Sequence, residues 1–302
     1  MQYISYLPLF ILGTIIGSFL NVVIYRLNSG FGMGGRSQCF SCGKVLRWYE
    51  LIPILSFLFL RGRCGVCRAK ISFQYPVVEF ITGMTFVLLF QKGSQVFMLA
   101  EIQEVTLLAS LWFVLCATAL ATLIVIAVYD LKHKIIPNSL SIIFASTSLV
   151  FLILKSPLLF FYLSGLNIFS WQVITPFLIE LSSGPVFFLF FFVFWFFSGG
   201  TWMGLGDAKL AIGIGWFLGW SAGVASLMLS FWIGALVSIG IIFLPKLLLH
   251  QKFFRLNSLP AGITIKSEVP FAPFLVISFF LVFFFDITLG GLQSFITTIF
   301  YL

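Results

Sequence analysis

Two aspartates stand out among the residues that could do chemistry. Asp207 follows Gly204-Leu205-Gly206, just beyond the very apolar run Phe187–Phe197, and Asp130 stands at the end of another apolar run. A carboxylate at the edge of a membrane is costly, so by default it is a functional residue whose partner must be found. Glu79 is a third possibility. The other acidic residues lie in loops or near the outer face: Glu50, Glu101, Glu104, Glu180, Glu268 and Asp286.

A pair of neighbouring carboxylates is the machinery of an aspartic peptidase. Two carboxylates within a few ångströms cannot both ionise, so they share one proton. One acts as general base on a water molecule, while the other donates to the carbonyl oxygen of the scissile peptide. The glycines before Asp207 would let the backbone approach an extended substrate. The alternative is that each aspartate pairs with a nearby lysine and caps a helix; spacing alone leaves both open.

Four cysteines form a second constellation. Cys39-x-x-Cys42 and Cys64-x-x-Cys67 lie 21 residues apart, a spacing typical of a tetrahedral zinc site with four thiolate ligands. Such a site is structural, because four thiolates leave no open position for water. The alternative is a pair of disulfides, which requires an oxidising compartment. The fifth cysteine, Cys116, is expected to serve packing. Only two histidines are present, so no Ser-His-Asp or Cys-His arrangement competes.

The composition of the chain indicates a membrane protein. Of its 302 residues, 61% are hydrophobic and only 9% are charged, against about a quarter in a soluble domain. The apolar runs are continuous rather than alternating, which argues against a β-barrel. We therefore expect an all-α, polytopic helical membrane protein in a lipid bilayer. The net charge of +8 does not indicate nucleic acid, because the basic residues gather in a few short loops.

The apolar runs predict about eight transmembrane helices, at about 20 residues per crossing. Residues 158–172 are expected to form an outer loop or a surface helix, and the placement of residues 289–302 is left open. We divide the chain into residues 1–104, which include a cytoplasmic zinc-binding loop at 27–75, and a six-span core at 105–302. The expected spans are Tyr3–Tyr25, Pro76–Phe90, Val105–Tyr129, 139–154, Phe177–Phe197, Leu210–Trp220, Val224–Phe243 and Phe271–Phe285.

The positive charges orient these spans. With this division, all of the 17 lysines and arginines except Lys92 and Lys155 fall on one face, which the positive-inside rule makes cytoplasmic. A reducing cytoplasm favours zinc over disulfides in the loop. Two spans separate Asp130 from Asp207, so both lie at the cytoplasmic boundary and only helix packing can bring them together.

These motifs together resemble the type IV prepilin peptidases, bacterial inner-membrane aspartyl proteases with a Gly-x-Gly-Asp motif. Gly204-Leu205-Gly206-Asp207 is similar to that motif, and Tyr129–Asn138 is similar to the segment around the family's first aspartate. The family often has Pro where this chain has Phe40, and Gly where it has Ala272. Further similar segments are Gly17–Arg26, the four cysteines, Arg61–Cys64, Tyr75–Glu79 and Pro270–Phe274.

The resemblance implies an activity and its residues. It implies that Asp130 and Asp207 cleave the basic leader of type IV prepilins or type II secretion pseudopilins after a glycine, at the cytoplasmic edge of the inner membrane. It also implies zinc on Cys39, Cys42, Cys64 and Cys67. Methylation of the new N-terminal residue with S-adenosylmethionine is expected, at a site that no motif locates. The alternative class is a transporter or assembly subunit that uses intramembrane acids, with a zinc loop for partner binding. No oligomeric state follows from the sequence.

Overall fold

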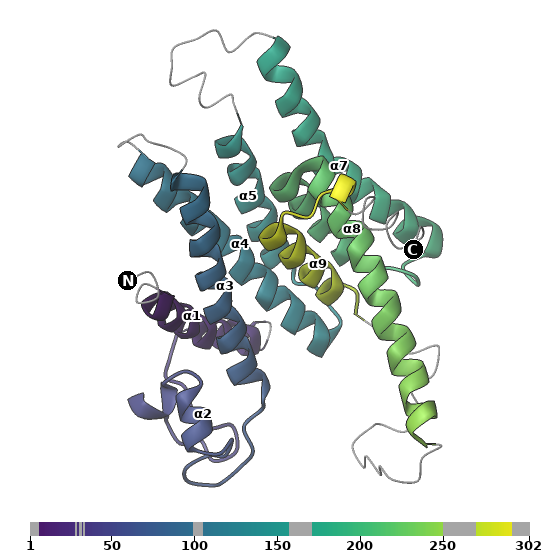
Figure 1. The fold of residues 1–302 in the computed structure, drawn as a ribbon. Coiled ribbons are helices and arrows are strands. Elements are labelled where there is room, and N and C mark those ends of the chain that lie inside the picture. Colours follow the sequence, from purple (N-terminus) through teal and green to yellow (C-terminus); the bar gives the residue numbers. More distant parts are fainter. Residues whose placement is uncertain are drawn as a thin grey trace. The chain divides into compact units, whose positions relative to one another are not determined.

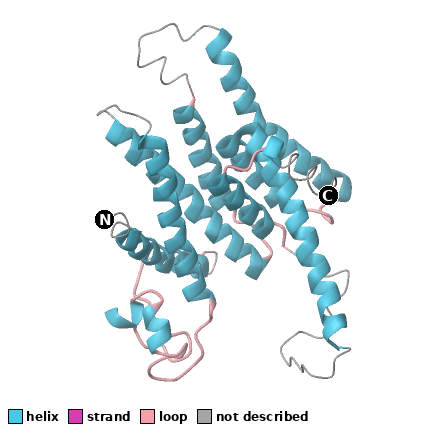
Figure 2. Cartoon of the chain, viewed as in Figure 1, coloured by secondary structure: helices cyan, strands magenta, loops and turns pink. Residues whose placement is uncertain are grey.

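The computed structural model describes residues 6–27, 29, 32, 34–98, 105–156, 171–249 and 270–291. Figure 2 shows helices joined by loops in these ranges, and the pairing between extended segments there consists of two isolated β-bridges. Residues 157–170, which make up most of the segment expected to be an outer loop, lie outside the described residues. So do residues 250–269, between the expected seventh and eighth spans, and the tail after residue 291. The chain forms two compact units, Met1–Tyr129 and Asp130–Leu302, whereas the sequence suggested a division after residue 104.

The helices confirm the predicted fold class. Five helices of the described ranges are long and apolar enough to cross a membrane. Each expected span falls on a helix, but the helix that holds the expected second span, Pro76–Phe90, is not one of these five. The expected sixth and seventh spans both lie in α8, and α9 is a shorter apolar helix. The long helices labelled in Figure 1 are α1 (Tyr6–Arg26), α3 (Gln74–Met98), α4 (Val105–His133), α5 (Asn138–Lys155), α7 (Trp171–Ser198), α8 (Leu205–Leu249) and α9 (Ala272–Phe285).

In the first unit, small residues bring α1 and α3 together. A Cβ added to Gly13 would lie 2.8 Å from the Cα of Gly83, and one added to Gly17 would lie 2.7 Å from the Cα of Glu79. Contacts this close exclude any side chain, so these glycines are what lets the two helices approach each other. Asn21 donates from its side chain to the Tyr75 carbonyl at 3.1 Å, which fastens the same pair of helices.

In the second unit, α8 reverses direction at Gly219. This glycine has φ 78° and ψ −170°, a conformation that residues with a side chain rarely adopt. Trp216, before the break, bonds the Leu181 carbonyl, and Trp220, directly after it, bonds that of Ile179, so the chain that leads up to the break runs antiparallel to α7. After the break, the Phe231 ring stacks on that of Phe191, further along α7. The helix is therefore a hairpin of two spans, as the sequence predicted (Figure 1).

Two residues of α7 stabilise this hairpin. Pro185 has no backbone N–H, so the Leu181 carbonyl lacks its donor within the helix, and the Trp216 indole supplies one at 2.9 Å. Glu180 accepts the backbone N–H of Trp220 at 3.2 Å, directly after the break in α8. These bonds satisfy polar groups that the membrane cannot hydrate.

The contacts of α5 and α9 give their directions. Asn138 contacts Lys209 and Phe151 stacks on Phe217, so α5 runs parallel to the first half of α8. Ser278 bonds Ser226 at 3.2 Å, and the backbone N–H of Leu289 donates to Ser221, so α9 runs antiparallel to the second half. Consequently α5, α8 and α9 all begin at one end of this unit, while Gly219 lies at the other.

We expect Gly215→Ala to destabilise the second unit. A Cβ there would lie 2.8 Å from the backbone of Ser183 and Gly184 in α7, which cannot move aside as a side chain can. Overpacking of this kind costs about 1–3 kcal/mol. Gly240→Ala is the matched control in the same helix, because nothing lies within 4 Å of its added Cβ. Thermal unfolding in detergent checks this; equal midpoints for the two variants would contradict the close contact.

Candidate active site and metal centre

The structure brings the two predicted aspartates together. Asp130 lies in the last turn of α4 and Asp207 in the first turn of α8, and both belong to the second unit. They are 5% and 7% exposed, which is unusual for acidic residues. Their carboxylates are close enough to interact electrostatically. Two buried carboxylates on separate helix ends therefore lie within electrostatic range of one another, on the same side of the membrane as the count of spans predicted.

The turn before Asp207 depends on its glycines. The backbone N–H of Gly204 bonds the Asp207 carboxylate, and the Asp207 N–H returns to the Gly204 carbonyl at 3.2 Å. A Cβ added to Gly206 would lie 2.9 Å from the Cβ of Ile136, in the connection between α4 and α5. Gly206 thus lets the first turn of α8 pack against the segment that follows Asp130. This packing role was not foreseen from the sequence, which suggested substrate approach instead.

Asp130 is held from two sides. Its carbonyl accepts the backbone N–H of Lys134 at 2.8 Å, and Lys134 closes the helix with φ 53°. Its carboxylate accepts the backbone N–H of Ala272, at the start of α9. A helix N-terminus carries unpaired N–H groups and partial positive charge, so it suits a carboxylate. The sequence signal for this contact was Pro273, which is favoured in the first turn of a helix.

Within the part of the chain that the structure describes, neither aspartate is paired with a lysine. Lys209, one half-turn after Asp207, donates instead to the Asn138 side chain at 2.7 Å. Within the described ranges, the ion pair that forms joins Lys44 to Glu50 in the loop of the first unit. The alternative interpretation, in which the aspartates are helix-capping partners of lysines, is therefore not what the structure shows.

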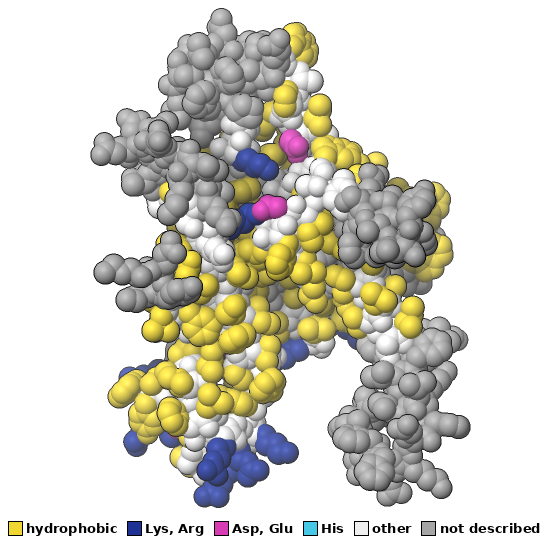
Figure 3. All heavy atoms as spheres, viewed as in Figure 1, with side chains coloured by type: hydrophobic (Ala, Val, Ile, Leu, Met, Phe, Trp, Pro, Cys, Tyr) yellow, Lys and Arg dark blue, Asp and Glu magenta, His cyan; other side chains and the backbone are white. Residues whose placement is uncertain are grey.

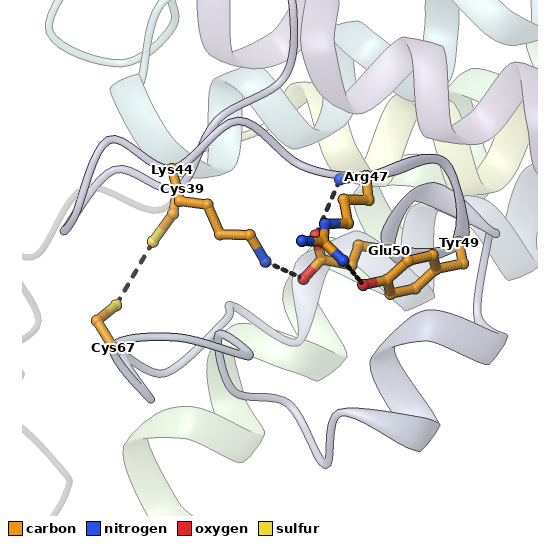
Figure 4. A network of polar contacts seen from close by, with 6 residues as sticks. All are labelled: Cys39, Lys44, Arg47, Tyr49, Glu50 and Cys67. Carbon is orange, nitrogen blue, oxygen red and sulfur yellow. Dashed lines mark hydrogen bonds and ion pairs between the residues drawn. The ribbon is translucent and has the colours of Figure 1, made fainter.

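The four loop cysteines converge on one point. Their Sγ atoms all lie within 4.8 Å of one another, and Cys39 and Cys67, which face each other in Figure 4, are 3.7 Å apart. A tetrahedral zinc with Zn–S bonds of about 2.3 Å holds its sulfurs about 3.8 Å apart. A disulfide needs about 2.05 Å, and all four cysteines are free. The donor set and its spacing fit zinc.

The two Cys-x-x-Cys turns have the same backbone hydrogen bonds. Cys39 N–H donates to the Lys44 carbonyl, and Cys64 N–H donates to that of Ala69, both at 2.9 Å. The backbone N–H of Gly43 donates to the Cys39 carbonyl, and that of Arg68 donates to the Cys64 carbonyl. Both donors have positive φ, 69° for Gly43 and 57° for Arg68. These turns aim backbone N–H groups at the sulfurs. Those of Val66 and Cys67 lower the pKa of Cys64 to about 6, which favours the thiolate form that zinc binds.

Glu50 braces the cysteine turns, a role that the sequence did not reveal. It is 8% exposed, and it accepts bonds from the Lys44 ammonium at 2.7 Å and the Arg47 backbone N–H at 2.9 Å. These donors lower the pKa of its carboxyl, first Arg47 and then Lys44. One of its oxygens would lie 3.3 Å from a Cβ on Gly65, in the second cysteine turn. Figure 4 shows Lys44 and Arg47 reaching Glu50 beside the cysteines.

Comparison with known proteins gives two matching family models. One, described as the bacterial peptidase A24 N-terminal domain, matches residues 11–92. The other, described as the type IV leader peptidase family, matches residues 117–239. The first includes the four cysteines, and the second includes both aspartates.

Curated proteins that carry the name prepilin leader peptidase/N-methyltransferase are similar to this chain. One from Klebsiella pneumoniae is 32% identical over 230 residues, covering 74% of this chain and 89% of the relative. One from Aeromonas hydrophila is 29% identical over 304 residues, covering 92% and 90%. One from Myxococcus xanthus is 40% identical over 135 residues, covering 44% and 36%. No solved structure matches the chain.

Proposed function

Because the chain belongs to the type IV leader peptidase family, whose members are prepilin leader peptidase/N-methyltransferases, we propose that Asp130 and Asp207 are its proteolytic dyad. The observation that supports this most is the convergence of two buried carboxylates from helix ends 77 residues apart, neither of them paired with a lysine. The substrates in this proposal are type IV prepilins or pseudopilins of type II secretion. The enzyme is a multi-pass protein of the bacterial inner membrane, with this site facing the cytoplasm.

The geometry supports a water-mediated cleavage. The pair shares one proton, because burial and mutual repulsion disfavour two negative charges. The ionised carboxylate takes a proton from water, whose oxygen bonds to the carbonyl carbon of the scissile peptide. The protonated carboxyl donates to the carbonyl oxygen at the same time. When the C–N bond breaks, the proton taken from water passes to the leaving nitrogen.

The second activity is the methylation of the new N-terminal residue. S-adenosylmethionine is the methyl donor that this activity implies, and we assign no residue of the described chain to its site. We propose that residues 1–104 carry this activity and that the zinc site holds their loop in shape. The four thiolates fit zinc as a structural ion, so no chemical step passes through the metal.

Co-expression with a prepilin from the same genome tests the proposal. The mature pilin should be shorter by its basic leader and heavier by one methyl group, as read by intact mass. A chain that leaves every prepilin and pseudopilin intact but moves protons or a solute across vesicles would establish the alternative, a transporter that uses intramembrane acids.

We expect the contact between Lys209 and Asn138 to set the distance between the two aspartates. It joins the first turn of α8, which carries Asp207, to the first residue of α5, the helix that follows Asp130 and the end of α4 in the chain. A hydrogen bond to a charged group contributes about 1.5–3 kcal/mol. Lys209→Met should slow single-turnover cleavage about tenfold or more. Asn138→Leu should do the same, and the double variant should be no slower than either single one.

Lys209→Arg is the matched control for this pair. It keeps the charge and a donor, so it should recover most of the cleavage rate that Lys209→Met loses. Fully additive effects in the double variant would contradict the coupling, and they would leave the assignment of the dyad untouched.

A further inference from the structure

The loop of the first unit exposes a run of large apolar side chains. These side chains come from the short 3-10 helix η2 (Trp48–Leu51), from α2 (Leu55–Phe59) and from the residues between them; η2 and α2 pack against each other. Trp48, Leu58 and Phe59 are 78%, 62% and 83% exposed. Apolar side chains scattered singly on a protein surface need no explanation, but six of them within twelve residues do. We call this set the loop patch: Trp48, Leu51, Ile52, Leu55, Leu58 and Phe59.

A hydrogen bond holds the loop patch beside the long helices of the first unit. The backbone N–H of Ile54, between η2 and α2, donates to the Glu79 carboxylate at 2.7 Å. Glu79 is a buried residue near the start of α3, and its Cα packs directly on Gly17 of α1. The segment is therefore fixed at the depth where these two helices cross, and it is not free to project into water.

The apolar surface continues from the loop patch onto the helices that lipid covers. Phe19 of α1 and Phe80 of α3 are 58% and 51% exposed, and Phe80 directly follows the residue that binds the loop. Figure 3 shows hydrophobic side chains gathered over this part of the molecule, with basic side chains at its far edge. The same apolar solvent that covers α1 and α3 thus reaches the loop.

Arginines lie at both ends of the loop patch. Arg47 precedes it, and Arg61 and Arg63 follow it; all three are exposed. Aromatic and apolar side chains next to arginine are typical of segments that lie in the interface of a bilayer and attract anionic lipid. A prepilin is a poor partner for these arginines, because the resemblance described above implies that its leader is also positively charged.

We propose that residues 47–63 form an interfacial anchor: the loop patch enters the inner leaflet of the bilayer, and the flanking arginines bind anionic lipid headgroups. The anchor holds the zinc-bearing turns against the membrane surface, next to the helices of the first unit. It does not depend on the peptidase activity, and it goes beyond it.

Photocrosslinking of the full chain tests the occupant of the loop patch. The substitution Phe59→p-benzoylphenylalanine keeps an aromatic ring at the most exposed position. The protein is reconstituted in vesicles of phosphatidylcholine with about one third phosphatidylglycerol, together with a prepilin. The expected product after irradiation is a phospholipid adduct, identified by intact mass. Leu189→p-benzoylphenylalanine, on an exposed face within α7, is the positive control for lipid.

The other outcomes overturn the proposal. An adduct with the prepilin or with a second copy would make the loop patch a protein-binding surface. If position 59 gave no adduct while position 189 captured lipid, the loop patch would lie in water. The double variant Arg61→Gln/Arg63→Gln should lower the preference of the adduct for phosphatidylglycerol severalfold. Arg36→Gln, a matched exposed arginine outside the segment, should not. If the double variant kept the same preference for phosphatidylglycerol, the proposed contact between the arginines and the headgroups would be refuted. Unchanged zinc content shows that each variant is folded.

Discussion

Replacing either Asp130 or Asp207 by asparagine should abolish leader cleavage, with a fall in rate of about a thousandfold or more. Asparagine keeps the size and the hydrogen bonds of the carboxylate but can neither take nor give the proton that the reaction moves. Either substitution also removes the partner with which the remaining acid shares its proton. Single-turnover cleavage of a purified prepilin, followed by mass, measures the effect without contributions from product release.

Asp286→Asn provides the matched control. This residue ends α9 with left-handed backbone, at the opposite end of that helix from the Ala272 contact with Asp130. Asparagine tolerates such a backbone, so cleavage should continue at the original rate. Both dyad variants should also accumulate to normal levels and still methylate a pilin that has already been processed. Cleavage within tenfold of the original rate in either dyad variant would refute the assignment.

The second large effect is expected at the zinc site. Cys64→Ser should reduce bound zinc from about one per chain to nearly none and leave the loop open to proteases. Cys64 is buried and one of four sulfurs within 4.8 Å, so its loss leaves an incomplete tetrahedron. Structural zinc contributes roughly 10–16 kcal/mol in peptides of similar size, and this loop has few buried apolar side chains to replace it.

Cys116→Ser is the control for this experiment. Cys116 is buried in α4 and is not among the cysteines that converge, so zinc content should not change. Metal analysis of the purified proteins and limited proteolysis are the two measurements. Full zinc content in Cys64→Ser would contradict the metal site. Disulfides trapped by alkylation during lysis would contradict both the metal site and the cytoplasmic position of the loop.

Features imposed by the bilayer could be predicted from the sequence. A span needs about 20 apolar residues whatever its neighbours are, so the helices were visible in composition alone. The parity of the spans then placed Asp130 and Asp207 on one face, and the structure brings them together. The cysteine spacing likewise predicted a cluster, because each turn is a local structure with its own hydrogen bonds.

Contacts made across helices could not be predicted. Lys209 bonds Asn138 across 71 residues, and Glu180 bonds the Trp220 backbone across 40. Polar residues at helix ends offer many partners, and only the packing selects one. The donor to Asp130 is a backbone N–H of Ala272, a group that every residue except proline has. Gly206 was recognised as important, but its neighbour, Ile136, was not.

The reversal of α8 at Gly219 also sets how thick the membrane can be around the dyad. The first half of α8 ends 14 residues after it begins, and α9 has 14 residues, so each spans about 21 Å. The hydrocarbon core of a bilayer is about 30 Å thick, and a protein with shorter apolar segments thins the lipid around it. Both helices start at the end that carries Asp130 and Asp207. The mismatch should therefore draw the headgroups and their water down to the carboxylates, so that a membrane-embedded substrate can meet the dyad without leaving the lipid.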